Sequence, residues 1–323
     1  MDPDTFLTTL YVMIDDFCQS QGFHEKHRPG PQASLSCSEV VTLAVFGQWA
    51  HFPSERAFYR YALRHLRAAF PTLPEREQFN RLQRQQRDVI VAFSLHLVDQ
   101  LQAQRCLYEA LDSSGIPTRD AKRRGSGWLA GQADIGWSNR IGWYEGFHLL
   151  TSITPTGVIT GFGFAAASCN DHSLAETFFA VRRHPSMRLT SVGAPAQGVY
   201  VADKGFAGDR LHRRWHAQYG AEVVSPPHQH SKVRWSKPWR RWLAGLRQII
   251  ETIYDKLLNT FRLARERLTR WTAFKRAWRR KSLCITFACG STCRWAASLW
   301  LSPTCSTGKF VISIHTKRLT SYI

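Results

Sequence analysis

The sequence has few acidic residues for its length, and this shortage excludes more classes of function than any other feature of its composition. Its 323 residues include 24 Asp and Glu against 43 Lys and Arg, which gives a net charge of +19. Such a surface attracts polyanions, either nucleic acid or an anionic membrane. No apolar stretch reaches the roughly 18 residues needed to span a bilayer. The start Met1-Asp2-Pro3-Asp4 lacks the basic residues of a secretory signal. We therefore expect a cytoplasmic, nucleoid-associated protein without a membrane partner.

Cysteine is also scarce, because eight residues in a chain of this length do not make a disulfide scaffold. Cys18, Cys37, Cys106 and Cys169 are isolated in the sequence and are expected to be small buried hydrophobes in a reducing compartment. No CxxC pair accompanies His228-Gln229-His230, so a zinc site there is only a weak alternative.

Residues 1–105 have the pattern of a helical bundle. Apolar residues recur at helical spacing between Phe6 and Phe17, and Ser36 with Glu39 fits a capping box. Further helices are expected over 54–70 and, with one break, over 75–104. Two roles stay open for this segment: binding of DNA ends, or dimerisation and packing.

From residue 106 the pattern changes to strands mixed with helices. The expected order is a strand ending at Asp112, a hairpin, a helix, a strand ending at Asp203, a helix, a short strand and a long helix. We expect the hairpin over residues 144–167 and the helix that follows it over 174–183. We expect the short strand over 221–225 and the long helix over 239–269. The predicted fold class is α+β: an N-terminal helical bundle followed by a mixed β-sheet covered by helices.

Three acids stand in distinctive settings. Asp112 and Asp203 each end an apolar run, and Glu251 lies within a helical run. An acid at the end of a buried strand is held rigidly while its carboxylate reaches the edge of the sheet. Carboxylates are the ligands that Mg²⁺ and Mn²⁺ prefer, and two such ions roughly 4 Å apart promote in-line attack on a phosphodiester.

Other residues compete with this assignment. Glu251 lies about 100° from the apolar stripe of its helix, beside Arg247, so it is either solvated and paired with an arginine or directed at the metals. Asp255, one helical turn later, is the alternative metal ligand if the assignment of Glu251 is wrong. Asp120, Asp134 and Asp171 are reserve acids, although Asp171 is better explained as a helix N-cap. His148, on a predicted strand, is expected to be a packed residue.

A basic segment covers residues 231–281, with 16 Lys or Arg against three acids and five interleaved tryptophans. This excess fits a track along a phosphate backbone, with aromatic rings for unpaired bases. Arg247 is either a surface ion-pair partner or a bidentate phosphate ligand. Together with Lys204, which follows Asp203, the expected phosphate-binding residues are Arg240, Arg241, Arg247, Lys256 and Arg262.

The motifs resemble those of the DDE transposases of bacterial insertion sequences, whose catalytic domain is ribonuclease H-like. They are Leu-Asp-Ser at 111–113, Val-Ala-Asp-Lys-Gly-Phe at 201–206, Arg-x-x-x-Glu-Thr at 247–252, and Asn-Asp-x-x-Leu at 170–174. The resemblance implies that Asp112, Asp203 and Glu251 hold two Mg²⁺ or Mn²⁺ ions. It also implies a homodimer on double-stranded DNA that cuts terminal inverted repeats and joins them to a target. Where many relatives have Tyr and Lys, this chain has Ala244 and Leu258.

Two other functions stay open: a ribonuclease H-like nuclease without strand transfer, and an inactive DNA-binding remnant. The expected domains are 1–105, helical; 106–281, catalytic; and 282–323, an irregular tail. Half of the cysteines fall in the last 40 residues without helical periodicity. We therefore interpret the tail as the product of a frameshift.

Overall fold

The structure is a computed structural model that describes residues 2–23, 33–120, 129, 131–183, 198–227, 231–232, 234–265 and 277–287. Residues 1–290 form one compact unit. Two features discussed in the sequence analysis lie outside the described residues: the pair His228 and His230, and the tail from residue 288. Within the described ranges, no helix is both long and apolar enough to cross a membrane.

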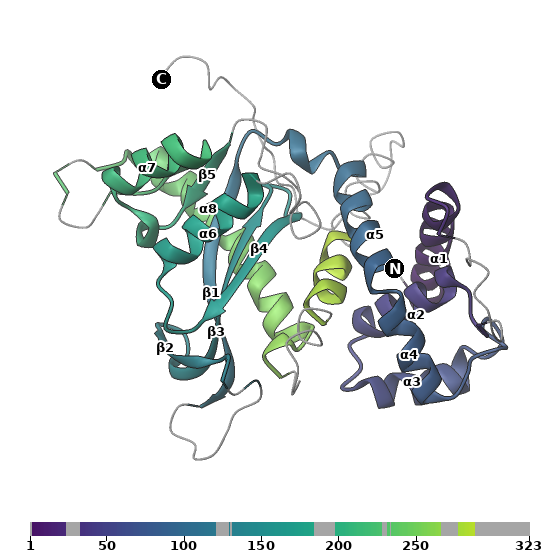
Figure 1. Ribbon diagram of the computed structural model, residues 1–323. Coiled ribbons are helices and arrows are strands. Elements are labelled where there is room, and N and C mark those ends of the chain that lie inside the picture. The colour runs from purple at the N-terminus through teal and green to yellow at the C-terminus, as the bar shows by residue number, and fades with distance from the viewer. Residues whose placement is uncertain are drawn as a thin grey trace, which may run out of the picture. The chain divides into compact units, whose positions relative to one another are not determined.

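The N-terminal segment is helical, as predicted (Figure 1). The capping box of the second helix is present, with the Ser36 hydroxyl accepting from the Glu39 N–H and the Glu39 carboxylate from the Ser36 N–H. Ser54 caps the third helix, and the expected single break of the last helix falls at Gln86. The helices are α1 Pro3–Ser20, α2 Cys37–Trp49, α3 Glu55–His65, α4 Arg76–Gln85 and α5 Arg87–Gln100, followed by a 3₁₀ turn at Ala103–Arg105.

The second part of the chain contains a mixed sheet, which confirms the predicted fold class. β3 pairs antiparallel with β1, β2 and β4, whereas β5 runs parallel to β1 and β6 parallel to β5. β2 was not expected from the sequence. The strands are β1 Glu109–Asp120, β2 Asp134–Ser138, β3 Gly142–Ile153, β4 Ile159–Ala166, β5 Val199–Ala202 and β6 Glu222–Val224.

Helices cover both faces of this sheet (Figure 1). Leu111 and Ala202 pack with apolar residues of α6 (Asp171–Arg183) and α7 (Asp209–Tyr219). Their neighbours Ala110 and Val201 belong to the cluster that includes the buried stripe of α8 (Lys237–Asp255). Because successive strand residues point to opposite faces, α8 lies on the face opposite α6 and α7.

The long C-terminal helix ends earlier than predicted. α8 stops at Asp255 and continues as a π-helical turn, Lys256–Thr260, and a 3₁₀ turn, Leu263–Arg265. The chain is helical again over 277–287. Phe287 packs on Phe6 with ring centroids 5.1 Å apart, and Cys284 is fully buried. The first six residues of the expected irregular tail are thus part of a packed helix, while the division at residue 105 stays a prediction.

The described cysteines are all free. Cys18 and Cys37 are buried, as expected, but they are not isolated in space, because their Sγ atoms lie 3.9 Å apart. Cys106 and Cys169 are only half-buried.

Candidate active site

Asp112 lies inside β1 and not at its end, which corrects the sequence-based expectation. The strand continues to Asp120 because β3 pairs with it throughout, with Asp112 opposite Thr151. The parallel pairing with β5 does end here, since its last pair is Leu111 with Ala202. Asp112 therefore stands at the point where β5 leaves the sheet, and its carboxylate accepts a hydrogen bond from the Ser113 N–H at 2.8 Å.

Asp203 follows β5 directly, as predicted. The last pair of these parallel strands is Leu111 with Ala202, and Asp112 and Asp203 are the residues that follow its two members. Neighbouring strands lie about 4.8 Å apart, and both residues share the α8 face with Ala110 and Val201. The Asp203 carboxylate accepts from the Lys204 N–H at 2.6 Å, which fixes the start of a 3₁₀ turn.

Glu251 lies on α8 and is linked to Asp203 by Arg247, which contacts both carboxylates. Arg247 Nη1 lies 3.3 Å from Asp203 Oδ1, and its Nη2 lies 3.5 Å from Glu251 Oε1. The Glu251 side chain is 61% exposed. In this structure Glu251 is therefore solvated and paired with an arginine, one of the two roles left open. It is nonetheless on the side of α8 that faces Asp203.

Asp112 lies in surroundings that disfavour its charge. The pKa of its carboxyl is raised to about 7. Burial is the largest cause and Asp203 and Asp171 add to it, while the hydrogen bond from Ser113 and the charge of Arg247 act in the opposite direction. A carboxylate crowded by two others is a place where a bound cation would be stabilising.

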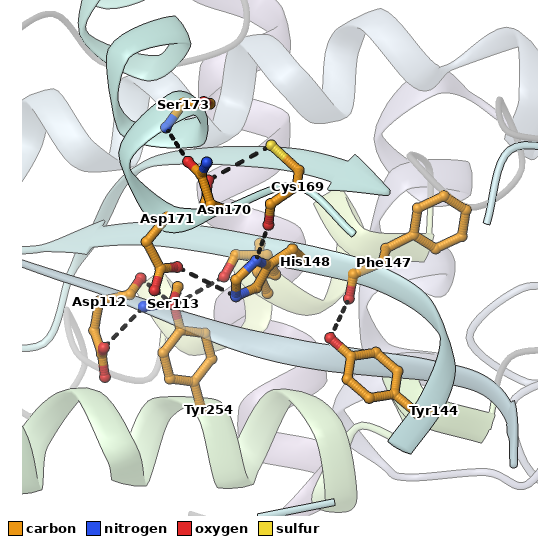
Figure 2. A network of polar contacts seen from close by, with 11 residues as sticks. Asp112, Ser113, Tyr144, Phe147, His148, Cys169, Asn170, Asp171, Ser173 and Tyr254 are labelled. Carbon is orange, nitrogen blue, oxygen red and sulfur yellow. Dashed lines mark hydrogen bonds and ion pairs between the residues drawn. The ribbon is translucent and has the colours of Figure 1, made fainter. Parts of the chain in front are cut away.

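Tyr254 holds the backbone of Asp112, a role that the sequence reasoning missed. Its hydroxyl donates to the Asp112 carbonyl at 2.6 Å and lies 3.4 Å from the Leu149 carbonyl, so it ties α8 to β1 and β3 (Figure 2). Tyr254 stands next to Ile253 on the buried side of α8. A tyrosine among buried apolar positions signals a hydrogen-bond partner.

Asp171 is not the N-cap of α6, which corrects a second expectation. The cap is Asn170, whose side-chain oxygen accepts from the Ser173 N–H at 2.8 Å. Asp171 Oδ1 instead lies 3.3 Å from Nε2 of His148, whose Nδ1 donates to the Cys169 carbonyl at 3.0 Å. Figure 2 shows Asp171 and His148 close to Asp112. His148 therefore makes polar contacts in addition to the packing expected from the sequence.

The donor set suits a hard divalent cation, although its members are not assembled here. Asp112, Asp203, Asp171 and Glu251 offer carboxylate oxygens, and Asp203 and Glu251 share the charge of Arg247. Within the described part of the chain, however, no group of three or more acidic, His or Cys side chains is placed to hold a metal ion. Asp112 and Asp203 lie where the pairing of β1 with β5 ends, and Arg247 bridges Asp203 and Glu251.

The predicted phosphate-binding residues are mostly at the surface. Lys204, Arg240, Arg241 and Lys256 are exposed, whereas Arg247 and Arg262 are half-buried. Among the interleaved tryptophans, Trp239 is exposed and contacts both Trp235 and Trp242, with ring centroids 6.1 and 5.3 Å away. Trp278 is fully buried against Phe162 and Phe164 and belongs to the core. Trp271 lies outside the described residues.

Asp112→Asn is expected to stabilise the metal-free protein above neutral pH. The carboxyl has a pKa of about 7 when folded and about 3.9 when unfolded. The folded state therefore keeps a proton that the unfolded state releases, and stability falls as pH rises from about 4 to about 7. Denaturant unfolding in a chelator should show the variant more stable at about pH 8, by up to about 4 kcal/mol, and unchanged at about pH 4. An equal difference at both pH values would contradict this explanation.

Comparison with known proteins identifies the family. Residues 110–287, more than half of the chain, match the family described as "Transposase DDE domain". A comparison with curated proteins gives no match. The structure of the Drosophila P element transposase strand transfer complex is 11% identical, with a TM-score of 0.28 over 66% of this chain; this chain spans only 47% of that one. The pre-cleavage Mos1 transpososome is 12% identical, with a TM-score of 0.23 over 85% of this chain and 87% of that one. Likenesses this low carry no weight, and the family match alone shows that the chain belongs to the transposase DDE domain family.

Proposed function

We propose that this chain is a DNA transposase that cuts and joins the ends of an insertion sequence, with Asp112, Asp203 and Glu251 as ligands of two Mg²⁺ or Mn²⁺ ions. The observation that carries the proposal is that Asp112 and Asp203 each follow a member of the last residue pair between β1 and β5, with Glu251 linked to Asp203 through Arg247. When bound, two such ions activate the attacking hydroxyl and stabilise the leaving oxygen of an in-line displacement.

The chain's own residues position these groups. The pairing of β1 with β3, and the Tyr254 hydroxyl on the Asp112 carbonyl, hold Asp112 rigidly. The exposed Glu251 side chain is free to change rotamer, whereas Asp203 is fixed by the Lys204 N–H. In this proposal Arg247 leaves the two carboxylates when DNA binds and contacts a phosphate instead, because a guanidinium pairs with phosphate as readily as with carboxylate.

The proposed partner is double-stranded DNA: the terminal inverted repeats and a target. The net charge of +19 supports binding of a polyanion. The exposed residues Lys204, Arg240, Arg241 and Lys256 place part of that charge near α8 and the end of β5. Two ends must be processed together, so the proposed active form is a homodimer on DNA.

Product analysis tests this function. A plasmid carrying the gene with its natural flanking DNA is incubated with the full chain and Mg²⁺ or Mn²⁺. Joined strands are the expected product. Nicked or linear DNA without joining would instead indicate a hydrolytic nuclease. DNA binding without either product would indicate an inactive remnant.

Glu251→Gln is expected to lower cleavage by about 10²-fold or more, because an amide cannot replace a charged metal ligand. The matched control is Asp255→Asn, one turn further along the chain and also exposed, which bonds only to Asn259 among the described residues. It should leave cleavage within about twofold, a difference of about 0.4 kcal/mol in the barrier. If Asp255→Asn loses most of its cleavage activity while Glu251→Gln stays active, Asp255 and not Glu251 is the metal ligand.

A further inference from the structure

A large cavity lies where the N-terminal helices meet the residues that follow α8. Its volume is about 870 Å³, in the upper part of the range for ligand pockets. One wall comes from α2 to α5 and the loop before α3, and the other from residues 260–264 and 277–281, with Thr118 of β1 between them. The cavity is separate from the Asp112 site, because it shares no lining residue with it.

The lining of this cavity is strongly cationic. Glu55 is the one acidic residue among its described lining residues. Three arginines come from each wall: Arg56, Arg84 and Arg87 from the helical segment, and Arg262, Arg279 and Arg280 from the later part of the chain.

Only part of this positive charge is balanced by the protein. Arg280 pairs with Glu55 at 3.0 Å and donates to Gln83 at 2.9 Å, and Arg87 pairs with Asp88 at 3.2 Å. Arg56 and Arg84 are exposed and have no ion-pair partner within the described part of the chain. Burial lowers the pKa of the Arg279 guanidinium, and neighbouring Arg87 lowers it further. A bound anion would stabilise like charges gathered in one cavity.

The spread of the cations points to a polyanion. They come from several chain segments on both walls of the cavity. A single phosphate needs only a few convergent donors, whereas a nucleic-acid strand carries one charge at each nucleotide. The cavity is too small to enclose a duplex, but it can take the backbone of one strand.

We propose that this cavity holds the phosphate backbone of a DNA strand and so joins the helical segment to the catalytic sheet in DNA binding. The choice of DNA as the source of phosphate rests on the proposed function. The inference makes the helical segment part of the DNA-binding surface, one of the two roles left open by the sequence.

The test is the salt dependence of DNA binding by the full chain. The probe is a random-sequence duplex, titrated in a chelator so that cleavage plays no part. Arg56→Gln/Arg84→Gln is expected to bind more weakly and to lower the slope of log K against log salt by about two. Arg64→Gln/Arg67→Gln is the matched control, because both residues are exposed, lie in the same segment and do not line the cavity. It should keep the wild-type slope.

Two further arms keep the outcome decisive. Arg56→Lys/Arg84→Lys retains the charges and should restore the slope, which separates loss of charge from misfolding. If the cavity variant and the control change the slope equally, the proposal is overturned. Calorimetry with inorganic pyrophosphate tests the other source of phosphate: pyrophosphate binding lost in the cavity variant while duplex binding is unchanged would also overturn it. Failure of the proposed catalysis appears only when metal is added, so the two results are distinguishable.

Discussion

Asp112→Asn is expected to lower DNA cleavage by about 10³-fold or more while leaving duplex affinity unchanged. A bound metal contributes several kcal/mol of transition-state stabilisation, and about 1.4 kcal/mol corresponds to a factor of ten in rate. Asparagine keeps the shape of the side chain but removes the charge. Binding should persist because a basic protein gains affinity for phosphate from its cations, and Asp112 supplies none.

The measurement pairs a cleavage assay with a binding titration. Asp134→Asn is the matched control: Asp134 is on β2 of the same sheet, is exposed, and was a reserve acid in the sequence. It should cleave like the wild type. Normal cleavage by Asp112→Asn would remove this residue from the site. Loss of both binding and cleavage would point to a structural role instead.

The sequence predicts the position of Asp203 correctly because an apolar run followed by Asp-Lys-Gly leaves little choice of where the strand ends. The same reasoning fails for Asp112. Ser113 and Ser114 end the apolar run, but β1 continues because β3 supplies pairing partners as far as Asp120. A strand held by a neighbour can carry polar residues that a local pattern assigns to a loop.

Features that depend on distant segments could not be predicted from the sequence. The contact between Arg247 and Asp203 requires knowledge of the face on which α8 packs. The helix over 277–287 has no clear amphipathic period because several sides of it are buried, with Leu283, Cys284, Ile285 and Phe287 all in the core. The cavity is lined by segments roughly 200 residues apart in the sequence, so no local motif can predict it.

Arg182→Met is expected to lower the free energy of unfolding by about 3–5 kcal/mol, because it strands a buried charge. Arg182 of α6 pairs in bidentate fashion with Glu109 of β1, and both side chains are 1% exposed. It also donates to the Ser152 hydroxyl at 3.0 Å and lies over the ring of Tyr200, 5.6 Å from the centroid. Burial alone would lower the pKa of Arg182, but Glu109 outweighs it, and the pKa is raised. Denaturant unfolding measures the loss.

Two comparisons separate charge from packing. Arg214→Met removes a surface pair with Glu176, whose side chains are 46% and 32% exposed, and should cost less than about 1 kcal/mol. In Glu109→Leu/Arg182→Met both charges are gone, so the double variant should be more stable than Arg182→Met alone. If the double variant is no more stable than Arg182→Met, lost packing and not the unpaired Glu109 carboxylate causes the loss of stability. Glu109 lies three residues before Asp112 and is the register partner of Tyr200 on β5. The buried ion pair therefore joins α6 to β1 at the place where β1 pairs with the strand that precedes Asp203.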